Sequence, residues 1–282
     1  LIWLASGTKI FTATAVMIAV ERKLISLDMH VSTVIPQMAT LGVLEGFSRG
    51  HETPILRPLQ RPITLRHLVT HTSGFGYLSF HKSLRRWSKL MGRDGENRTG
   101  TIDDYIQPLL FQPGEGWAYG PGLDWAGRVL EVVLGSTLEQ IFQDFIWSSI
   151  GLRDTTFFPA RRPSLVSRRA RIYLADGDTF VPKDETPVPL NPRDCLGGLG
   201  IWSTPHEFSV FLFHLFVQPT LVKPETLALM SQMDSTVPKL SQNRFLQAFT
   251  SSGDVSLFPS TSLKPGIGFC RLANLYEYPL VV

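Results

Sequence analysis

Cysteine is scarce in this sequence, and this scarcity narrows the possible classes of protein. The only two cysteines, Cys195 and Cys270, lie far apart and form no C-x-x-C pair. This spacing argues against a disulfide framework and against a zinc site, so we expect two free thiols. The His-Glu pairs at His51 and His206 also lack the second histidine that an H-E-x-x-H metal site requires.

A dominant sign of charge is missing as well. The chain has 27 Lys and Arg against 24 Asp and Glu, a formal net charge of +3. This mixed charge gives no reason to expect nucleic acid as a partner. The densest basic stretch runs from Arg161 to Arg171. We interpret it as a solvated loop, with a binding patch as the less favoured alternative.

The first 20 residues are apolar but do not form a convincing membrane span or leader. Lys9 is their only charge, and Ser6 with several threonines makes them too polar for a span of about 20 apolar residues. A signal peptide would have its positive charge before the apolar run. We therefore expect a buried core helix and no membrane association. The sequence fixes no compartment, although we favour a cytoplasmic over a secreted protein.

The composition is that of a globular protein with a sizeable core. Hydrophobic residues make up 43% of the 282 residues and aromatic residues 11%. We expect a single domain over residues 1–282. Patterns of caps and apolar periodicity predict about six helices and few strands. The expected elements are a helix at 6–22, a hairpin within 41–63, a helix capped by Thr64, an irregular surface segment at 82–100, a helix opening at 101–104, a helix from Pro121 to Gly135, loop and short strand at 159–195, helices starting at Thr204 and Lys223, and capping boxes at Ser136–Glu139 and Thr204–Glu207.

Ser6 and Lys9 form an S-x-x-K motif at the start of the first helix. Three residues span just under one helical turn, so the Lys9 ammonium can lie beside the Ser6 hydroxyl. The helix N-terminus adds partial positive charge and free N–H groups where an oxyanion would form. This arrangement suits a nucleophile and its base. The alternative is a surface serine beside a lysine that extends from a core helix.

Tyr119 lies in a glycine- and proline-rich segment, residues 111–121, directly before a predicted helix. A phenol on such a loop can reach a neighbouring nucleophile and act as its base. The alternative is an aromatic side chain that packs the loop onto the core. The glycines at 197, 198 and 200 offer flexible backbone that could approach a substrate, without the spacing of a nucleotide-binding loop.

Ser48 stands in a G-x-S-x-G pattern, the spelling of the nucleophile elbow. That motif needs a buried strand before the serine and a helix after it. Pro54 and Pro58 follow instead. We therefore predict that Ser48 is a turn serine and not a nucleophile.

Taken together, these segments resemble the serine β-lactamase and penicillin-binding-protein family. The resemblance rests on residues 3–13 with S-x-x-K, 63–74, 117–119, 150–157 and 197–204, in the order typical of the family. The segment 113–127 is similar to fungal members that include lovastatin-acyltransferase-like enzymes. The resemblance implies an α+β fold of the β-lactamase/transpeptidase type, with the helical part dominant and much of the antiparallel sheet missing.

The resemblance also implies a chemistry. Ser6 would attack a carbonyl of a small ester or thioester, Lys9 and Tyr119 would move the proton, and water or an alcohol would take the acyl group. No metal or organic cofactor is implied, and the partner is a small-molecule acyl substrate. The oligomeric state stays open.

Three departures from the family pattern keep two alternatives open. Pro121 stands where the tyrosine motif usually has Asn, and Lys264-Pro-Gly266 is a poor third motif because proline does not suit a central strand. Both ends of the pattern are also missing, so we expect a truncated chain whose helix at 6–22 exposes apolar faces. The alternatives are an inactive remnant and a true β-lactamase or D-Ala-D-Ala peptidase.

Overall fold

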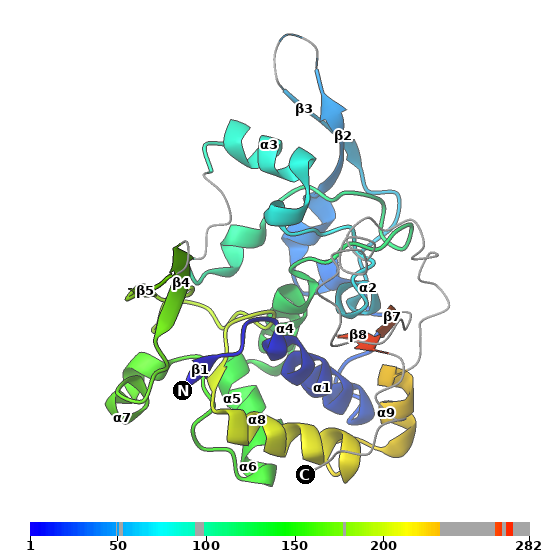
Figure 1. Cartoon of the computed structure of the whole chain (residues 1–282). Helices are drawn as coiled ribbons and strands as arrows, with labels where there is room; N and C mark the ends of the chain where they lie inside the picture. Colours follow the sequence, from blue (N-terminus) through cyan, green and yellow to red (C-terminus); the bar gives the residue numbers. More distant parts are fainter. Residues whose placement is uncertain are drawn as a thin grey trace.

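Helices dominate the architecture, as predicted. The computed structural model describes residues 1–231 except 49, 51–52, 94–98 and 177–178, and the backbone of 263–266 and 269–272. The α-helices (Figure 1) are α1 (Thr8–Glu21), α2 (Leu65–Val69), α3 (Lys82–Leu90), α4 (Gly122–Leu134), α5 (Leu138–Phe142), α6 (Ser148–Ile150), α7 (Pro163–Val166), α8 (Pro205–Leu212) and α9 (Pro224–Ser231). Shorter or wider helical turns are η1 (Ala5–Gly7), η2 (Val31–Thr33), η3 (Pro36–Thr40), η4 (Leu78–Phe80), η5 (Ile102–Tyr105), η6 (Gln143–Trp147), η7 (Pro159–Arg161) and η8 (Phe213–Val217).

The described strands form only two-stranded antiparallel pairs. They are β1 (Ile2–Trp3) with β6 (Trp202–Ser203), β2 (Gly42–Phe47) with β3 (Pro54–Pro58), β4 (Ile172–Asp176) with β5 (Thr179–Lys183), and β7 (Leu263–Gly266) with β8 (Phe269–Leu272). The Lys-Pro-Gly spelling lies in β7, which pairs with β8 in the part of the chain that the structure describes.

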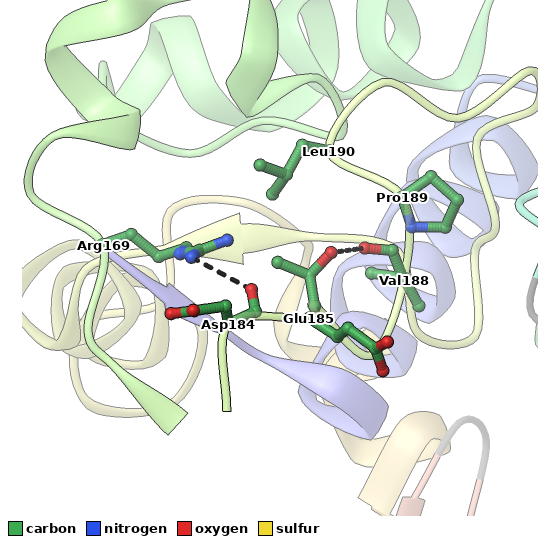
Figure 2. A pocket seen from close by; sticks show the side chains of 7 residues that line it. Arg169, Asp184, Glu185, Val188, Pro189 and Leu190 are labelled. Carbon is green, nitrogen blue, oxygen red and sulfur yellow. Dashed lines mark hydrogen bonds between the residues drawn. The ribbon is translucent and has the colours of Figure 1, made fainter. Parts of the chain in front are cut away.

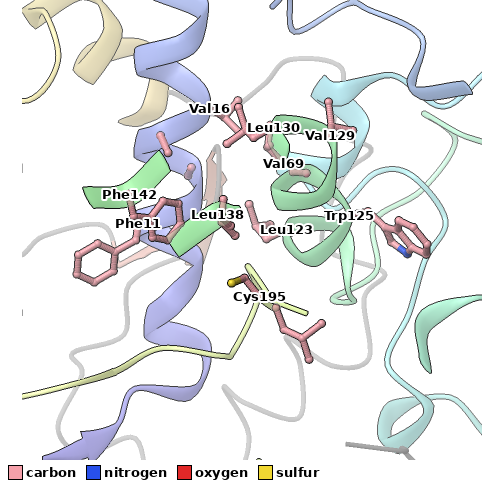
Figure 3. Close-up of a cluster of buried hydrophobic side chains, with 14 of the residues drawn as sticks. Phe11, Val16, Val69, Leu123, Trp125, Val129, Leu130, Leu138, Phe142 and Cys195 are labelled. Carbon is pink, nitrogen blue, oxygen red and sulfur yellow. The ribbon is translucent and has the colours of Figure 1, made fainter. Parts of the chain in front are cut away.

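Helix α1 lies at the centre of the core. Its residues 8–19 are all buried, which suits a helix that is apolar on every side. Figure 3 shows Phe11 and Val16 of α1 beside Leu123 of α4 and Leu138 of α5. The expectation that this helix exposes apolar faces is therefore wrong. The physical reason is that α4, α5 and the rings of Phe208 and Phe211 on α8 cover it.

The pair β1–β6 fixes the start of α1 against the glycine-rich segment. Ile2 lies opposite Ser203, and the Leu4 N–H donates to the Ile201 carbonyl at 2.9 Å. The Ile201 N–H in turn donates to the Thr8 hydroxyl at 3.1 Å. These bonds bring residues that are nearly 200 positions apart to the same end of α1.

Two predicted capping boxes are wrong in the same way. Thr137, not Ser136, caps α5, and the Glu139 carboxylate accepts from the Phe157 N–H at 2.8 Å. Thr204 does cap α8, but the Glu207 carboxylate accepts from backbone N–H groups of the 153–154 loop. Both carboxylates thus satisfy buried donors of a distant loop, where an unpaired donor would be costly.

Three further segments test the local predictions. Residues 82–90 are helical as α3 with Leu84 fully buried, so the prediction of an irregular segment is wrong there: one apolar face was enough to dock it. The segment at 101–104 forms only the short turn η5. The cap at Thr64 is confirmed, and so is the stop of α4 at Gly135, which adopts a left-handed φ of 62°.

Candidate active site

Ser6 lies in the turn η1, directly before α1, with an exposed side chain. Ala5 before it has a φ of 46°, a left-handed conformation that is uncommon for a residue with a Cβ. Lys9 follows within the first turn of α1, and its Nζ lies 3.2 Å from the Ser6 Oγ. The S-x-x-K spacing therefore brings the two side chains together as expected.

Tyr119 reaches the same hydroxyl from a distant loop. Its OH lies 2.6 Å from the Ser6 Oγ. The loop is held by the Tyr77 N–H, which donates to the Tyr119 carbonyl at 3.1 Å, and by the Ala118 N–H, which donates to the His71 carbonyl at 3.0 Å. All three residues singled out in the sequence, Ser6, Lys9 and Tyr119, thus meet at one point.

Lys9 is buried, with 2% of its surface exposed. Its Nζ has three acceptors: the Ser6 Oγ at 3.2 Å, the Tyr77 OH at 3.1 Å and the Gly198 carbonyl at 2.8 Å. An ammonium group has three N–H donors, so this set can use all of them. The Tyr119 ring adds a cation–π contact, with its centroid 4.8 Å from Nζ.

The glycine-rich segment is part of this site. The Gly197 carbonyl accepts from the Thr12 hydroxyl at 2.6 Å, and the Gly198 carbonyl accepts from Lys9. A Cβ on Gly198 would lie 2.1 Å from the Asp124 Oδ2, so no larger residue fits without a shift. The segment therefore packs against Lys9, although the two are 189 positions apart in the sequence.

Asp124 and Tyr77 were missed by the sequence analysis. Asp124 is fully buried on α4; its Oδ1 accepts from the Gly198 N–H at 2.8 Å, and its Oδ2 accepts from the Tyr77 OH at 3.4 Å. Burial raises the pKa of the Asp124 carboxyl to about 6, against the opposing effect of Lys9. A lone acid on the apolar face of the 122–134 helix was the available signal for Asp124. No local pattern marks Tyr77.

His71 supports the tyrosine loop as a neutral ring. Burial and, second, the charge of Lys9 lower the pKa of His71 to about 3. Its Nδ1 accepts from the Gly120 N–H at 3.4 Å, and its ring lies 5.0 Å from that of Tyr119 and 5.8 Å from that of Trp117. His71 has a left-handed φ of 60°, which the packing around it must stabilise.

Ser48 has none of these surroundings among its described contacts. It follows β2, and its hydroxyl and N–H exchange hydrogen bonds with the Thr53 backbone at 3.3 and 2.9 Å. Strand β3 comes next in place of a helix. The prediction that Ser48 is a turn serine is confirmed.

Four arginines of the basic stretch, at 161, 162, 168 and 169, contact other parts of the chain. Arg161 covers the Phe158 ring at 3.6 Å, and Arg168 pairs with Asp154 at 2.5 Å. Arg169 donates to the Asp184 carbonyl at 3.5 Å and borders an open depression of about 490 Å³ (Figure 2), lined by Arg169, Asp184, Glu185, Thr186, Val188, Pro189 and Leu190. Ser6 is not among these lining residues, so we place the chemistry elsewhere.

The described residues offer little to a metal or a membrane. Within them, no cluster of three or more His, Cys, Asp and Glu side chains is arranged to hold a metal ion. Of the helices in the described ranges, none has the length and apolarity to cross a bilayer. Cys195 is a buried free thiol whose pKa is raised by burial, and the Cys270 side chain lies outside the described part.

The sequence is similar to a known family and to curated relatives. The family described as Beta-lactamase matches residues 2–252. A lovastatin esterase from Penicillium rubens is 36% identical over 82% of this chain and 59% of its own length. A monacolin J acid methylbutanoyltransferase from Aspergillus terreus is 34% identical over 81% of this chain and 56% of its own.

Solved structures agree at the level of the fold. A mutant form of simvastatin synthase from Aspergillus terreus superposes with a TM-score of 0.81 at 32% identity, over 94% of this chain and 64% of that chain. The chain thus spans little more than half the length of the curated relatives it matches.

Proposed function

Because the chain belongs to the β-lactamase family, we propose that it is a serine esterase or acyltransferase that acts through an acyl-enzyme on Ser6. The observation that carries this proposal is the pair of groups at the Ser6 Oγ: the Tyr119 OH at 2.6 Å and the Lys9 Nζ at 3.2 Å. Both distances lie within reach for direct proton transfer.

In the first half-reaction, the Ser6 Oγ attacks the carbonyl carbon of a small ester or thioester. Tyr119, acting as a phenolate beside the Lys9 ammonium, takes the hydroxyl proton and gives it to the departing alcohol or thiol. The start of α1 directly after Ser6 adds partial positive charge, which would favour the negative charge that the carbonyl oxygen gains. The product is an acyl group on Ser6.

In the second half-reaction, an acceptor hydroxyl replaces the leaving group. The Tyr119 phenolate takes its proton, its oxygen attacks the acyl carbon, and the proton passes from Tyr119 to the departing Ser6 Oγ. Water as acceptor gives hydrolysis, and an alcohol gives transfer. The names of the relatives, an esterase and an acyltransferase, cover both outcomes and support an ester-type substrate.

A β-lactam or peptide amide is the less supported substrate. Pro121 is the N-cap of α4, two residues after Tyr119, and its ring offers no side-chain donor or acceptor to an amide. An ester makes no such demand, since its leaving alcohol needs only the proton from Tyr119 and Lys9.

The test is intact-mass spectrometry of the chain after exposure to a fluorophosphonate, with peptide mapping, followed by turnover of p-nitrophenyl butyrate. We expect one phosphonyl adduct, on Ser6, and a burst of p-nitrophenol equal to the chain concentration. Added butanol should divert part of the acyl group to butyl butyrate. A folded chain, checked by circular dichroism, that gives no Ser6 adduct and no burst would contradict the proposal.

A further inference from the structure

Four groups behind Ser6 form a closed ring of hydrogen bonds. The Lys9 Nζ donates to the Tyr77 OH at 3.1 Å, and the Tyr77 OH donates to the Asp124 Oδ2 at 3.4 Å. The Asp124 Oδ1 accepts from the Gly198 N–H at 2.8 Å, and the Gly198 carbonyl accepts from Lys9 at 2.8 Å. Asp124 therefore reaches the lysine through two arms, the Tyr77 phenol and the backbone of Gly198, whose N–H and carbonyl belong to successive peptide groups.

We propose that Asp124 is the positioning residue of the active site, which holds the Lys9 ammonium at Ser6 through the Tyr77 hydroxyl and the backbone of Gly198. The proposal rests on the function proposed above, because Lys9 matters only if Ser6 reacts. It adds two residues to the active site: Asp124 as the countercharge and Tyr77 as the link between Asp124 and Lys9.

The direction of each bond follows from the donors available. The Lys9 ammonium has only donors, so the Tyr77 oxygen must accept from it. The Tyr77 proton then needs an acceptor on its other side, and the Asp124 Oδ2 is the atom that lies there. The second carboxylate oxygen accepts from the Gly198 N–H, which anchors this residue beside Asp124 while its carbonyl, in the next peptide group, accepts from Lys9.

The charges agree with this assignment. Asp124 is fully buried, and an isolated buried carboxylate is strongly disfavoured. The groups that face it are Lys9 from α1, the Tyr77 phenol and the Gly198 N–H. Lys9 is also the only buried lysine in the part of the chain that the structure describes. The two charges therefore compensate each other at a distance, and the two arms between them leave the ammonium free to contact Ser6.

An amide at position 124 would disturb one arm in a defined way. In Asp124→Asn the side-chain oxygen can still accept from the Gly198 N–H, but the NH₂ group would then point at the Tyr77 oxygen. The Tyr77 hydroxyl would lose its acceptor and turn its proton towards Lys9, which is itself a donor. The substitution removes the countercharge and reverses the phenol arm while the shape of the side chain is retained.

The protonation of Asp124 gives a readout that packing alone would not produce. Below its pKa of about 6 the carboxyl is neutral and no longer acts as the countercharge. We expect the rate of Ser6 phosphonylation in the wild type to fall as the pH drops through this region. Asp124→Asn should react slowly and lack this acid limb.

The experiment compares four chains: wild type, Asp124→Asn, Tyr77→Phe and Glu131→Gln. Each is mixed with a fluorophosphonate over pH 4.5–9, and the Ser6 adduct is followed by mass spectrometry. We expect a loss of about 100-fold for Asp124→Asn, in the range for disturbed general acid–base catalysis. Tyr77→Phe should lose about tenfold, since one hydrogen bond to a charged group is removed and the Gly198 arm remains.

Glu131→Gln is the matched control, because it removes another carboxylate from α4. Glu131 accepts from the Leu138 N–H at 2.8 Å and from Arg128 at 3.0 Å, contacts that support the start of α5. We expect a lower urea midpoint with an unchanged labelling rate. Asp124→Asn should lower the labelling rate, and its urea midpoint should fall too, because the buried Lys9 charge loses its countercharge. Glu131→Gln then shows that a lower midpoint alone does not slow the labelling.

A second measurement separates this proposal from the proposed function. With ε-¹³C-lysine, a fixed Lys9 side chain gives two resolved ε-proton resonances, which should merge in Asp124→Asn. If the fluorophosphonate does not label Ser6 of the wild type, the function proposed above fails. The lysine resonances still show whether Asp124 holds Lys9 in place. Unchanged resonances, or an unchanged rate and acid limb in Asp124→Asn, would overturn the positioning role.

Discussion

Two serines in this chain stand in short motifs that spell a nucleophile, and their surroundings differ in every respect that matters to chemistry. Ser6 precedes a helix whose residues 8–19 are buried, and it lies within hydrogen-bond distance of a lysine and a tyrosine. Ser48 follows a strand of a two-stranded hairpin and bonds to the backbone of Thr53. The comparison teaches that the spelling of a motif is less informative than the element that follows it.

The difference has a physical origin. A helix start offers unpaired N–H groups and places the fourth residue of S-x-x-K beside the first. It also buries Lys9 against Gly198 and Tyr77, which come from other parts of the chain. Ser48, by contrast, uses its hydroxyl and its N–H within the hairpin, where both bond to the Thr53 backbone. Ser6 is therefore the product of tertiary packing, and Ser48 of local structure.

The largest expected effect separates the two serines directly. Ser6→Ala should abolish the fluorophosphonate adduct, because it removes the hydroxyl that lies within hydrogen-bond distance of Lys9 and Tyr119. Ser48→Ala should leave the adduct and its rate unchanged. Peptide mapping after intact-mass spectrometry measures both. Labelling that survives Ser6→Ala, or that disappears with Ser48→Ala, would reverse the assignment.

The elements that carry the serines should differ in stability as well. Phe11 is fully buried on α1, and its ring stacks on Phe211 at 3.8 Å, so Phe11→Ala should cost about 3–5 kcal/mol of unfolding free energy. Phe47 beside Ser48 is only half-buried under the Arg86 guanidinium at 4.2 Å. Phe47→Ala should cost about 1 kcal/mol. Urea denaturation followed by circular dichroism measures both, and equal losses would show that the hairpin is as tightly coupled to the core as α1.

The same contrast explains how much of the molecule could be predicted from its sequence. Local features predict the helices at 8–21 and 122–134: runs of apolar residues and stop signals such as Gly135. The trio at the site came from a local spacing and from resemblance. Wherever a side chain serves a distant partner, local reasoning failed: Glu139 and Glu207 look like helix caps but bind the loop at 153–157.

Tyr77 and Asp124 escaped for the same reason. Their contacts with Lys9 and with Gly198 join residues 68 and 74 positions apart, and no window along the sequence contains both partners. Asp124 could have been suspected, since a charged residue on the buried face of an apolar helix needs a partner. For Tyr77 the sequence carries no comparable sign.

The smallest of the three effects tests the partner that most clearly distinguishes Ser6 from Ser48. Tyr119→Phe removes the hydroxyl at 2.6 Å from the Ser6 Oγ and keeps the ring against His71 and Lys9. Acylation by p-nitrophenyl butyrate should slow by about 100-fold, the scale for loss of a general base. Tyr173→Phe, on the exposed strand β4, is the control and should not change the burst rate. If Tyr119→Phe acylates as fast as wild type, Tyr119 is not the base, and it would then serve only to pack the loop over the lysine.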